Sequence, residues 1–562
     1  MTDYYDLGDY QRKVSTTDQE AQTWFDRGLM WCYAYNHEEA VRCFERVVEY
    51  DPTCLMGYWG IGYAAGPNYN KPWEYFVDED LRLTLSICYE AIEQGMQHLE
   101  GATGVEQALM KALISRYQSQ QPDPEEDLEV WNDDYADAMR LVYRQFPDDL
   151  DVATLFAEAI INRTPWLLWD LPNRRPTEGA GTIEAMEVLE RGLQQIEEQG
   201  LPTHPGLAHM YIHTMEMSPT PEKALLAADS LRELTPDAGH LLHMPSHIDV
   251  LCGHYYDAVV ANNRAIAADN RYLQREGAFN FYTLYRCHDF HFKIYAALFL
   301  GQYKSAIEAT EEMLSTIGDE ILRMPQFPMA DLLESLFSMK MHVLIRFGKW
   351  REILDEPLPA DPDLYLHTTA MQHYARAIAY AVQGELDKAD EERALFRVAA
   401  ARVPEERYLF NNTCIDILAI AAEMMDGEVE YRKGKYETAF AHLRRSVELD
   451  DNLLYAEPWG WIQPARHALG ALLLEQGHLE EAEAVYQADL GLDDTLSRPS
   501  QHPDNVWSLH GYVECLHKLG KHHEAAAAQA RLDLASARAD VPITSSCFCR
   551  VGGKEASHDH CC

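Results

Sequence analysis

The segment WFDRGLMWCYAYNHEEAVRCFERVVEYDP, residues 24–52, places small and large residues at offsets that suit a pair of packed helices. Gly28 and Ala40 are small enough to let two helices approach, while Trp31 and Phe44 are large enough to fill the space between them. A single helix pair of this kind cannot bury its apolar face alone, because it needs neighbouring pairs to stack on. We therefore expect the pattern to recur along the chain.

The pattern recurs as a turn in which a glycine is followed, five residues later, by a small or apolar residue. Clear copies are Gly253 with Ala258, Gly301 with Ala306, Gly384 with Ala389, Gly434 with Ala439, Gly477 with Ala482 and Gly520 with Ala525. Weaker copies are Gly348 with Ile353 and Pro219 with Ala224. Because the spacing between these turns varies, we expect an irregular array with helices of unequal length.

These offsets resemble those of the tetratricopeptide repeat, whose helix pairs stack into a right-handed superhelix. The resemblance implies an all-α solenoid for most of the chain. The chain also resembles a group of large bacterial and fungal tetratricopeptide proteins without an assigned activity, in the blocks AYNHEEAVRCF (34–44), GYWGIGYAAGPNYN (57–70), HMYIHTMEMS (209–218) and GHLLHMPSHI (239–248). This second resemblance supports the fold and leaves the function open.

The chain is expected to contain three runs of repeats, at residues 1–121, 177–320 and 321–540. Residues 122–176 include PDPEED and TPWLLWDLPNRRP and lack a turn of this type. They are interpreted as a degenerate repeat or an insertion, either a lid over the concave surface or a plain surface loop. Residues 541–562 are predicted to form a flexible tail rich in cysteine and histidine.

Composition argues against several classes of function. Asp and Glu number 91 against 47 Lys and Arg, and the resulting net charge of −44 would repel nucleic-acid phosphates and anionic membranes. No stretch approaches the roughly 18 apolar residues of a membrane span, and residues 1–14 lack the features of a signal peptide. We therefore expect a cytoplasmic protein with no nucleic-acid or membrane partner. A homo-oligomer is compatible with the sequence.

Histidine is concentrated at the second, fifth, ninth and twelfth positions of the expected repeats. The resemblance to tetratricopeptide proteins implies that these helix positions line the concave groove. These residues are His209, His213 and Glu216 before Pro219; His240, His243 and His247 before Gly253; and His288 and His291 before Gly301. Spacings of three and four residues place side chains on one helix face. Neighbouring helix axes lie about 8–10 Å apart, so imidazoles from adjacent helices can reach a common ion. The sequence therefore predicts a metal site.

Donors of this kind favour copper, with iron or zinc as alternatives, over magnesium or calcium. Seven histidines exceed one tetrahedral site, so either two ions bind side by side or some histidines orient the others. The favoured ligands are His209, His213, His243, His247 and His291, with Glu216 as a further ligand or a general base. Pro245 predicts a kink or a late helix start between His243 and His247. Without metal, the histidines would form a neutral hydrogen-bonded stack or recognise an acidic peptide.

Two further groups of residues are candidates for function. Trp461, Arg466, His467 and His510 in later repeats are predicted to contact substrate or to be ordinary polar lining. In the tail, SSCFCRVGGKEASHDHCC (545–562), the predicted metal donors are Cys547, Cys549, His558, His560, Cys561 and Cys562. A redox-labile disordered end, or prenylation of the final cysteines, are the alternatives for this tail. His37, just after a turn, is expected to have a structural role.

Two classes of function fit these observations. The first is a metal-dependent enzyme, an oxidoreductase that uses copper or iron on a small organic substrate in the superhelix channel, with Glu216 as acid or base; a zinc hydrolase is a weaker variant. The second is a non-catalytic adaptor that binds a peptide or protein partner in its concave groove. No nucleotide cofactor is expected, because the sequence has no Walker loop, no dinucleotide fingerprint and neither a G-x-S-x-G nor an H-E-x-x-H motif.

Overall fold

The computed structural model describes residues 4–122, 126–324 and 329–550. The regular structure of these residues is almost entirely helical, and the strands form two short antiparallel hairpins. The chain divides into two compact units, of which unit 1 takes in the chain up to Phe292 and unit 2 most of the chain after that residue. The predicted all-α solenoid is confirmed.

Unit 1 contains the first part of the array. Its elements are α1 (Gln19–Tyr33), α2 (His37–Tyr50), α3 (Leu55–Ala65), η1 (Trp73–Tyr75), α4 (Asp78–Gly95), η2 (Met96–Gly101), α5 (Gly104–Arg116), α6 (Glu129–Gln145), α7 (Leu150–Ile161), β1 (Trp169–Asp170), β2 (Arg175–Pro176), α8 (Thr182–Gln199), α9 (Pro205–Glu216), η3 (Pro221–Ala224), α10 (Leu225–Leu231), α11 (Gly239–His243), α12 (Pro245–Leu251) and α13 (Tyr255–Glu276). The next helix, α14 (Tyr282–Leu300), begins in unit 1 and ends in unit 2.

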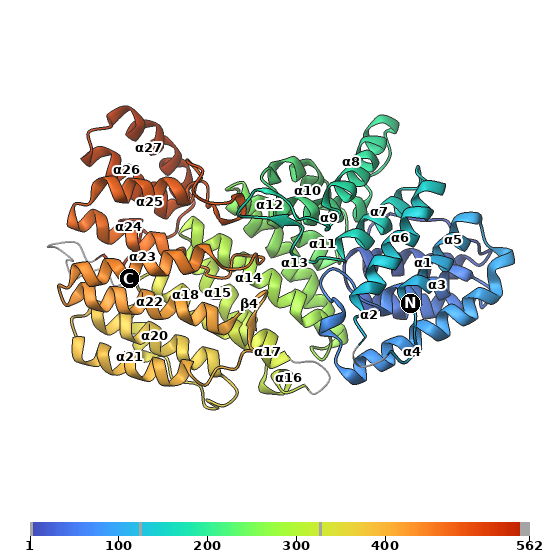
Figure 1. Ribbon diagram of the computed structural model, residues 1–562, viewed down its shortest axis with the longest axis horizontal. Coiled ribbons are helices and arrows are strands. Elements are labelled where there is room, and N and C mark those ends of the chain that lie inside the picture. The colour runs from blue at the N-terminus through green and yellow to red at the C-terminus, as the bar shows by residue number, and fades with distance from the viewer. Residues whose placement is uncertain (1–3, 123–125, 325–328, 551–562) are drawn as a thin grey trace. The chain divides into compact units, whose positions relative to one another are not determined.

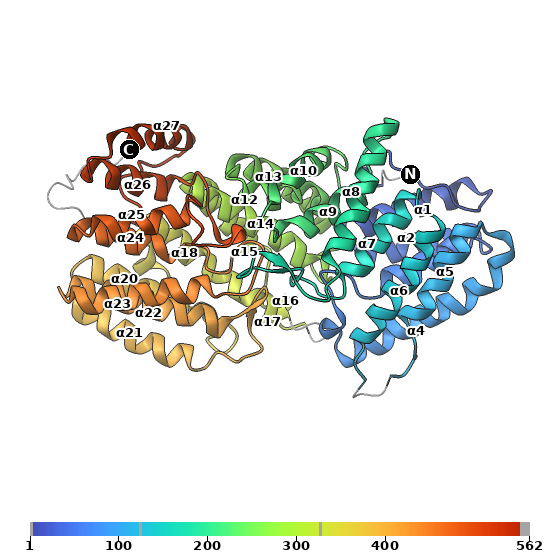
Figure 2. The ribbon, with the colours of Figure 1, turned by 45° about the horizontal axis from the view of Figure 1, so that its top comes forward.

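Unit 2 continues the array. Its elements are α15 (Tyr303–Ser315), α16 (Asp319–Leu322), α17 (Met329–Leu333), η4 (Glu334–Ser338), α18 (Met339–Arg346), α19 (Trp350–Asp355), α20 (Leu366–Val382), α21 (Leu386–Ala400), β3 (Tyr408–Leu409), β4 (Asn412–Thr413), α22 (Cys414–Arg432), α23 (Tyr436–Asp451), α24 (Ala465–Gln476), α25 (Leu479–Asp489), α26 (Val506–Lys518) and α27 (His522–Ser536), with η5 (Arg498–Ser500) at the division between the units. Figures 1 and 2 both show α20 beside α21 and α22 beside α23 as antiparallel pairs.

The first helix pairs form around the Phe44 ring, as the sequence predicts. A Cβ atom added to Gly28 would lie 2.7 Å from this ring, and one added to Gly60 would lie closer still, so only glycine lets α1 and α3 approach α2 at these points. Phe44 and Ala40 are fully buried. Burial of a phenylalanine side chain stabilises the fold by roughly 1.5–3 kcal/mol, and the small neighbours make that burial possible.

The predicted turns are present, and their glycines have the left-handed backbone that favours this residue. The φ angles lie between 63° and 82° at Gly253, Gly301, Gly348, Gly384, Gly434, Gly477 and Gly520. Each of these glycines lies between the two helices of a pair. The turn chemistry of the repeat is therefore the same in both units.

Proline divides the helix that carries three of the histidines. The helix α11 ends at His243 and α12 begins at Pro245, so the proline lies in the first turn of a new helix. A backbone N–H at that position has no partner within the helix, so its absence in proline costs no hydrogen bond. His247 then donates its backbone N–H to Met244. The break lets α11 and α12 take separate directions while both remain packed against α13.

Residues 126–176 contain a helix pair, α6 and α7, followed by a loop that includes the hairpin β1–β2. This loop lies against α9, because the Trp169 indole donates a hydrogen bond of 2.8 Å to the carbonyl oxygen of Thr214. In the described part of the chain, no helix is both long and apolar enough to cross a membrane.

Candidate metal centre

Three helices of unit 1, α9, α11 and α12, and the part of α14 that lies in unit 1 supply the histidine side chains. The helix α9 begins after His204, whose Nδ1 accepts the backbone N–H of Leu207, and every residue of α9 is buried. The i, i+4 spacing within α9 and across the α11–α12 break places two imidazoles on one helix face in each case. The helix α14 contributes His288, which is 9 % exposed; the other triad histidines are almost completely buried. The predicted open groove is thus a closed interior at this point.

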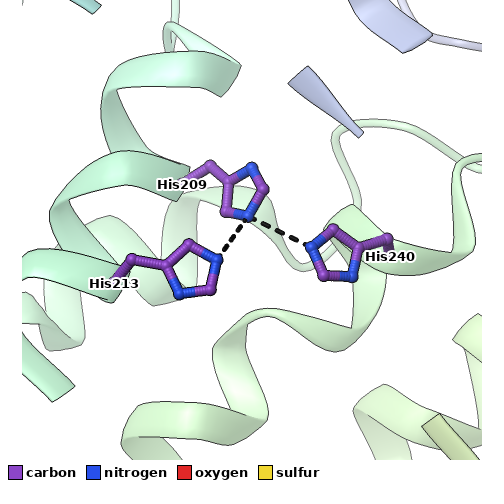
Figure 3. Close-up of side chains that lie close together, drawn as sticks. All are labelled: His209, His213 and His240. Carbon is purple, nitrogen blue, oxygen red and sulfur yellow. Dashed lines mark hydrogen bonds between the residues drawn. The ribbon is translucent and has the colours of Figure 1, made fainter. Parts of the chain in front are cut away.

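Three imidazoles form a first group, defined here as triad A: His209, His213 and His240. The Nε2 atom of His209 lies 3.0 Å from Nε2 of His213 and 3.2 Å from Nε2 of His240 (Figure 3). Nitrogens bound about 2.0–2.1 Å from one ion, at angles between perpendicular and tetrahedral, lie roughly 2.9–3.4 Å apart. These two distances therefore match those between ligands of one transition-metal ion, and the third pair, His213 and His240, lies within 4.8 Å.

Hydrogen bonds on the outer side of triad A fix where the ring hydrogens lie. Nδ1 of His209 lies 2.6 Å from the carbonyl oxygen of Tyr33, which can only accept, so Nδ1 carries the hydrogen. Nδ1 of His213 lies 2.8 Å from the Glu216 carboxylate, which gives the same tautomer. The Nε2 lone pairs of His209 and His213 consequently face each other, which is unfavourable without a cation or a shared proton between them.

Burial makes a proton shared between the imidazoles of triad A unfavourable, because it would place a positive charge in the protein interior. It holds the pKa of His209 and of His240 well below the ordinary value, and neighbouring imidazoles lower the pKa of each further. Neutral imidazole with an accessible Nε2 lone pair is the form that binds a metal ion. Burial therefore keeps the imidazoles of His209 and His240 neutral, which is the form in which histidine can bind a metal ion.

A second group, triad B, consists of His243, His247 and His288. Nε2 of His243 lies 2.8 Å from Nε2 of His247, and the His288 ring lies 4.6 Å from the His243 ring between centroids. Nδ1 of His243 lies 2.7 Å from Oδ1 of Asn262, which again assigns the hydrogen to Nδ1. Burial lowers the pKa of His243 to about 3. Triad B therefore repeats the close Nε2 pair of triad A, and a ring nitrogen of His288 lies within 4.8 Å of that pair.

Glu216 connects the two triads. Its Oε1 accepts from Nδ1 of His213 in triad A at 2.8 Å, and its Oε2 accepts from Nδ1 of His247 in triad B at 2.5 Å. The rings of these two histidines lie 5.6 Å apart between centroids. A carboxylate on the outer nitrogen orients an imidazole and increases its basicity toward a metal. The role of Glu216 as general base stays a prediction, and the contacts described here are those of an orienting group.

Tyr35 closes one side of triad A and has an unusual backbone. Its ring stacks on His240 and His213, with centroid distances of 5.3 and 5.9 Å. Its φ is 53°, in the left-handed region that costs a non-glycine residue roughly 1–2 kcal/mol. Tyr35 follows α1 at the turn position where the pairs described above carry glycine. A strained tyrosine in place of glycine suggests a functional role for this position. The sequence contains this substitution, but the spacing of the repeat does not single it out.

The structure leaves several predicted residues outside the triads. His291 is fully buried on α14 and belongs to neither triad, whereas His288, three residues earlier, joins triad B. The structure thus brings His288 together with His243 and His247, and the ligand role of His291 stays a prediction. The contributions of Tyr33, Asn262 and Tyr35 were not predicted, because their partners lie far away in sequence.

The predicted substrate contacts all lie in unit 2, whereas the triads lie in unit 1. His467 is fully buried, and its Nε2 lies 2.9 Å from Asp489. Arg466 is paired with Asp451, and the Trp461 ring packs against His342. His510 is partly exposed on α26. These side chains have structural partners or lie at the surface of unit 2, and their contact with a substrate stays a prediction.

The predicted tail donors divide into two sets. Cys547 and Cys549 are buried and joined by a disulfide near the Glu428 carboxylate, so their sulfurs are thiolates only after reduction. His558, His560, Cys561 and Cys562 lie outside the described residues. The tail's metal-binding role stays a prediction.

Comparison with known proteins adds little to this site. No protein-family model matches the chain, and no curated protein matches its sequence. Among solved structures, the crystal structure of yeast Tom70 is similar over 93% of this chain and 98% of its own, with 12% identity and a TM-score of 0.31. A likeness at this level carries no argument about function. The fold and the two triads define a helical-repeat protein with a buried histidine centre.

Proposed function

We propose that this chain is a metal-dependent oxidoreductase that holds copper at triads A and B and acts on a small organic molecule. The observation that supports this most directly is the approach of the Nε2 atoms of His209 and His213 to 3.0 Å, while Nδ1 of each ring faces an oxygen, the carbonyl oxygen of Tyr33 and the carboxylate of Glu216. A neutral hydrogen-bonded stack needs a donor at each contact, and with the hydrogens of both rings on Nδ1 neither Nε2 can donate here. A cation between the rings removes the conflict.

The donor set favours copper over the alternatives. Imidazole suits zinc, copper, iron and nickel, and affinity for divalent ions rises along this series to a maximum at copper. Non-haem iron oxygenases typically combine two histidines with one carboxylate ligand. Here the Glu216 carboxylate faces the outer nitrogens of His213 and His247. His240, His243 and Asp289 form a buried group of two histidines and one carboxylate, so iron is the alternative at that group. Zinc bound by three histidines would support hydrolysis, and is the weaker alternative.

The protein's own contribution is orientation and exclusion of water. Tyr33, Glu216 and Asn262 hold the outer nitrogens and so keep the inner lone pairs directed at the ions. Tyr35 and Phe292 pack against the rings of triads A and B respectively. Bound copper would supply one-electron redox steps. The buried surroundings would limit access of water to such a centre.

Elemental analysis of protein purified without a histidine tag tests the proposal. We expect about two copper ions per chain after loading, one for each triad. His213→Ala and His247→Ala should each remove the ion of the triad concerned. His291→Ala is the matched control, because His291 is a buried histidine outside both triads and its loss should leave the ions bound. Protein that takes up no stoichiometric metal, or loses it equally in all three variants, contradicts the proposal.

A second candidate function, an adaptor that binds an extended peptide, is favoured by an observation in unit 2. The segment 545–550 lies against the helices of that unit. Arg346 on α18 donates to the carbonyl oxygen of Ser546, and Arg432 on α22 donates to that of Cys549. Arg550 forms a bidentate ion pair with Glu514 on α26, at 2.6 and 2.9 Å. Backbone carbonyl contacts of this kind do not depend on one side-chain sequence.

A truncated chain tests the adaptor function. Removal of residues 541–562 would uncover these helices, and a synthetic peptide ITSSCFCRV, residues 543–551, should then bind to the truncated chain. Glu514→Gln should weaken binding, because it removes the charge that pairs with the arginine. If the peptide does not bind, or if Glu514→Gln binds it equally well, unit 2 does not recognise peptides through these contacts.

A further inference from the structure

A cavity of about 260 Å³ lies beside triad A in unit 1. It is lined by the turn after α1, the end of α3, the middle of α4 and the start of α14. Leu83 on α4, which is 60 % exposed, lies in its wall and marks the side that reaches the surface. The volume is slightly below the range of roughly 300–1,000 Å³ that is usual for ligand pockets, so the cavity suits a small molecule.

Two aromatic rings separate this cavity from the metal centre. Tyr35 and Tyr285 both line the cavity, and both also contact the His240 ring, with centroid distances of 5.3 and 5.0 Å. Tyr282 and Phe281 add further aromatic surface to the lining. A molecule in the cavity would therefore be one side chain away from a triad A histidine. Aromatic rings in such a wall favour an aromatic ligand, through stacked and edge-to-face contacts.

Two buried polar atoms of the lining, at the start of α2, have no partner among the described residues. Oδ1 of Asn36 accepts from the backbone N–H of Glu39, so the unpaired atom is the Nδ2 donor. Asn36 is 1 % exposed. Nδ1 of His37 lies 3.1 Å from the carbonyl oxygen of Ala64, and with the hydrogen on Nδ1 the unpaired Nε2 is an acceptor. Asn36 thus offers a donor and His37 an acceptor, which are the two partners that a hydroxyl group requires.

The charge of the lining excludes an anionic ligand. The one cation among the described residues of the wall, Lys71, is already paired with Asp80 at 2.8 Å. Glu38 also lines the cavity, so the charged groups sum to a negative value. Burial lowers the pKa of His37 to about 4, and its imidazole is neutral at pH 7. A carboxylate or phosphate would meet no free positive charge here.

We infer that this cavity binds the substrate of the metal centre and that the substrate is a small uncharged phenol. This inference rests on the proposed function for the link to copper, whereas binding in the cavity depends only on the lining residues. The phenol ring would lie against Tyr35 and Tyr285, and its hydroxyl would bridge Asn36 and His37. Tyr35 would then contact both the phenol and His240.

Calorimetric titration of the full chain with phenol tests the inference, with benzoate as an anionic probe of similar size. We expect one phenol per chain and an affinity at least tenfold higher than that for benzoate. Asn36→Asp should lower phenol affinity at least tenfold, because it replaces the donor with an acceptor and preserves the oxygen that caps α2. Asn263→Asp, the same change at an exposed position on α13, should leave binding unaltered. Ile87→Trp, on a half-buried cavity residue, should also weaken binding, because it fills part of the space.

The outcomes separate this inference from the proposed function. Phenol affinity that is the same in the wild type and Asn36→Asp, or matched by benzoate, overturns the cavity assignment whatever the metal content. Protein that binds phenol in an Asn36-dependent way but holds no copper retains the cavity and overturns the proposed function. In copper-loaded protein, phenol should shift the visible absorption of the metal. An unchanged spectrum on saturation refutes the assignment of the cavity to the metal centre.

Discussion

Replacement of Glu216 by glutamine is the most informative perturbation of the centre, because one carboxylate holds an imidazole of each triad. The wild-type side chain accepts from His213 and His247 at 2.8 and 2.5 Å. Each hydrogen bond to a charged group contributes about 1.5–3 kcal/mol. Glutamine retains one acceptor, and its NH₂ group would face the N–H of the other histidine. That imidazole would have to move its hydrogen to Nε2, which would remove a lone pair from its triad.

The expected result is a loss of metal affinity without loss of the fold. Changes to orienting partners of metal-binding histidines typically cost 10–100-fold in affinity, or about 1.4–2.8 kcal/mol. We expect a loss of this size for at least one of the two copper ions, measured by competition with a chromophoric chelator. Glu190→Gln is the control, since Glu190 accepts one hydrogen bond from Tyr211 on α9 and touches neither triad. If both ion affinities of Glu216→Gln equal those of the control, the argument from ring orientation is wrong.

The remaining predictions concern Tyr35, Gly434 and Glu428. Tyr35→Gly should lower the free energy of unfolding by about 2 kcal/mol in urea titrations. Loss of the buried ring costs about 3–5 kcal/mol, which outweighs the relief of left-handed strain at about 1–2 kcal/mol. A variant more stable than the wild type would contradict the packing of the Tyr35 ring on triad A. Gly434→Ala should cost about 1 kcal/mol from backbone strain alone, because its φ is 75° and an added Cβ would meet no atom within 4 Å; a thermal-melting loss several times larger would contradict this. Burial raises the pKa of Glu428 to about 7 from 4.5, so its stabilising effect is complete below pH 4.5 and is lost as pH rises through 7. The free energy of unfolding of Glu428→Gln should therefore exceed that of the wild type by up to about 3 kcal/mol at pH 8 and should equal it at pH 4. An equal difference between variant and wild type in urea unfolding at the two pH values would disprove this prediction.

The repeat architecture was predictable because its determinants are local. A glycine at a turn must adopt a left-handed backbone that most residues avoid, and a glycine facing Phe44 must leave room for the ring. Both constraints appear in the sequence as residue types at fixed spacing. Pro245 was also informative, although the sequence left open whether it would kink a helix or begin one.

The detail of the centre was less predictable because it depends on long-range geometry. Helical spacing places His288 and His291 near one face, but only the rotation of α14 about its axis decides which of them meets His243. The same limitation applies to Asn262, which orients a ring from a different helix. The closure of the site depends on Tyr69, whose ring packs on His213, and on the loop that contains Trp169. Such contacts leave no periodic signal in the sequence.

The shared carboxylate has a consequence for how the centre fills. Glu216 accepts from His213 and His247 at the same time, so a shift of either ring on binding the first ion is passed to the other triad, and the two sites are coupled. The affinity for the second ion should then differ from the affinity for the first. In native mass spectra of half-loaded protein, the share of singly loaded chains would accordingly depart from the share expected for independent sites.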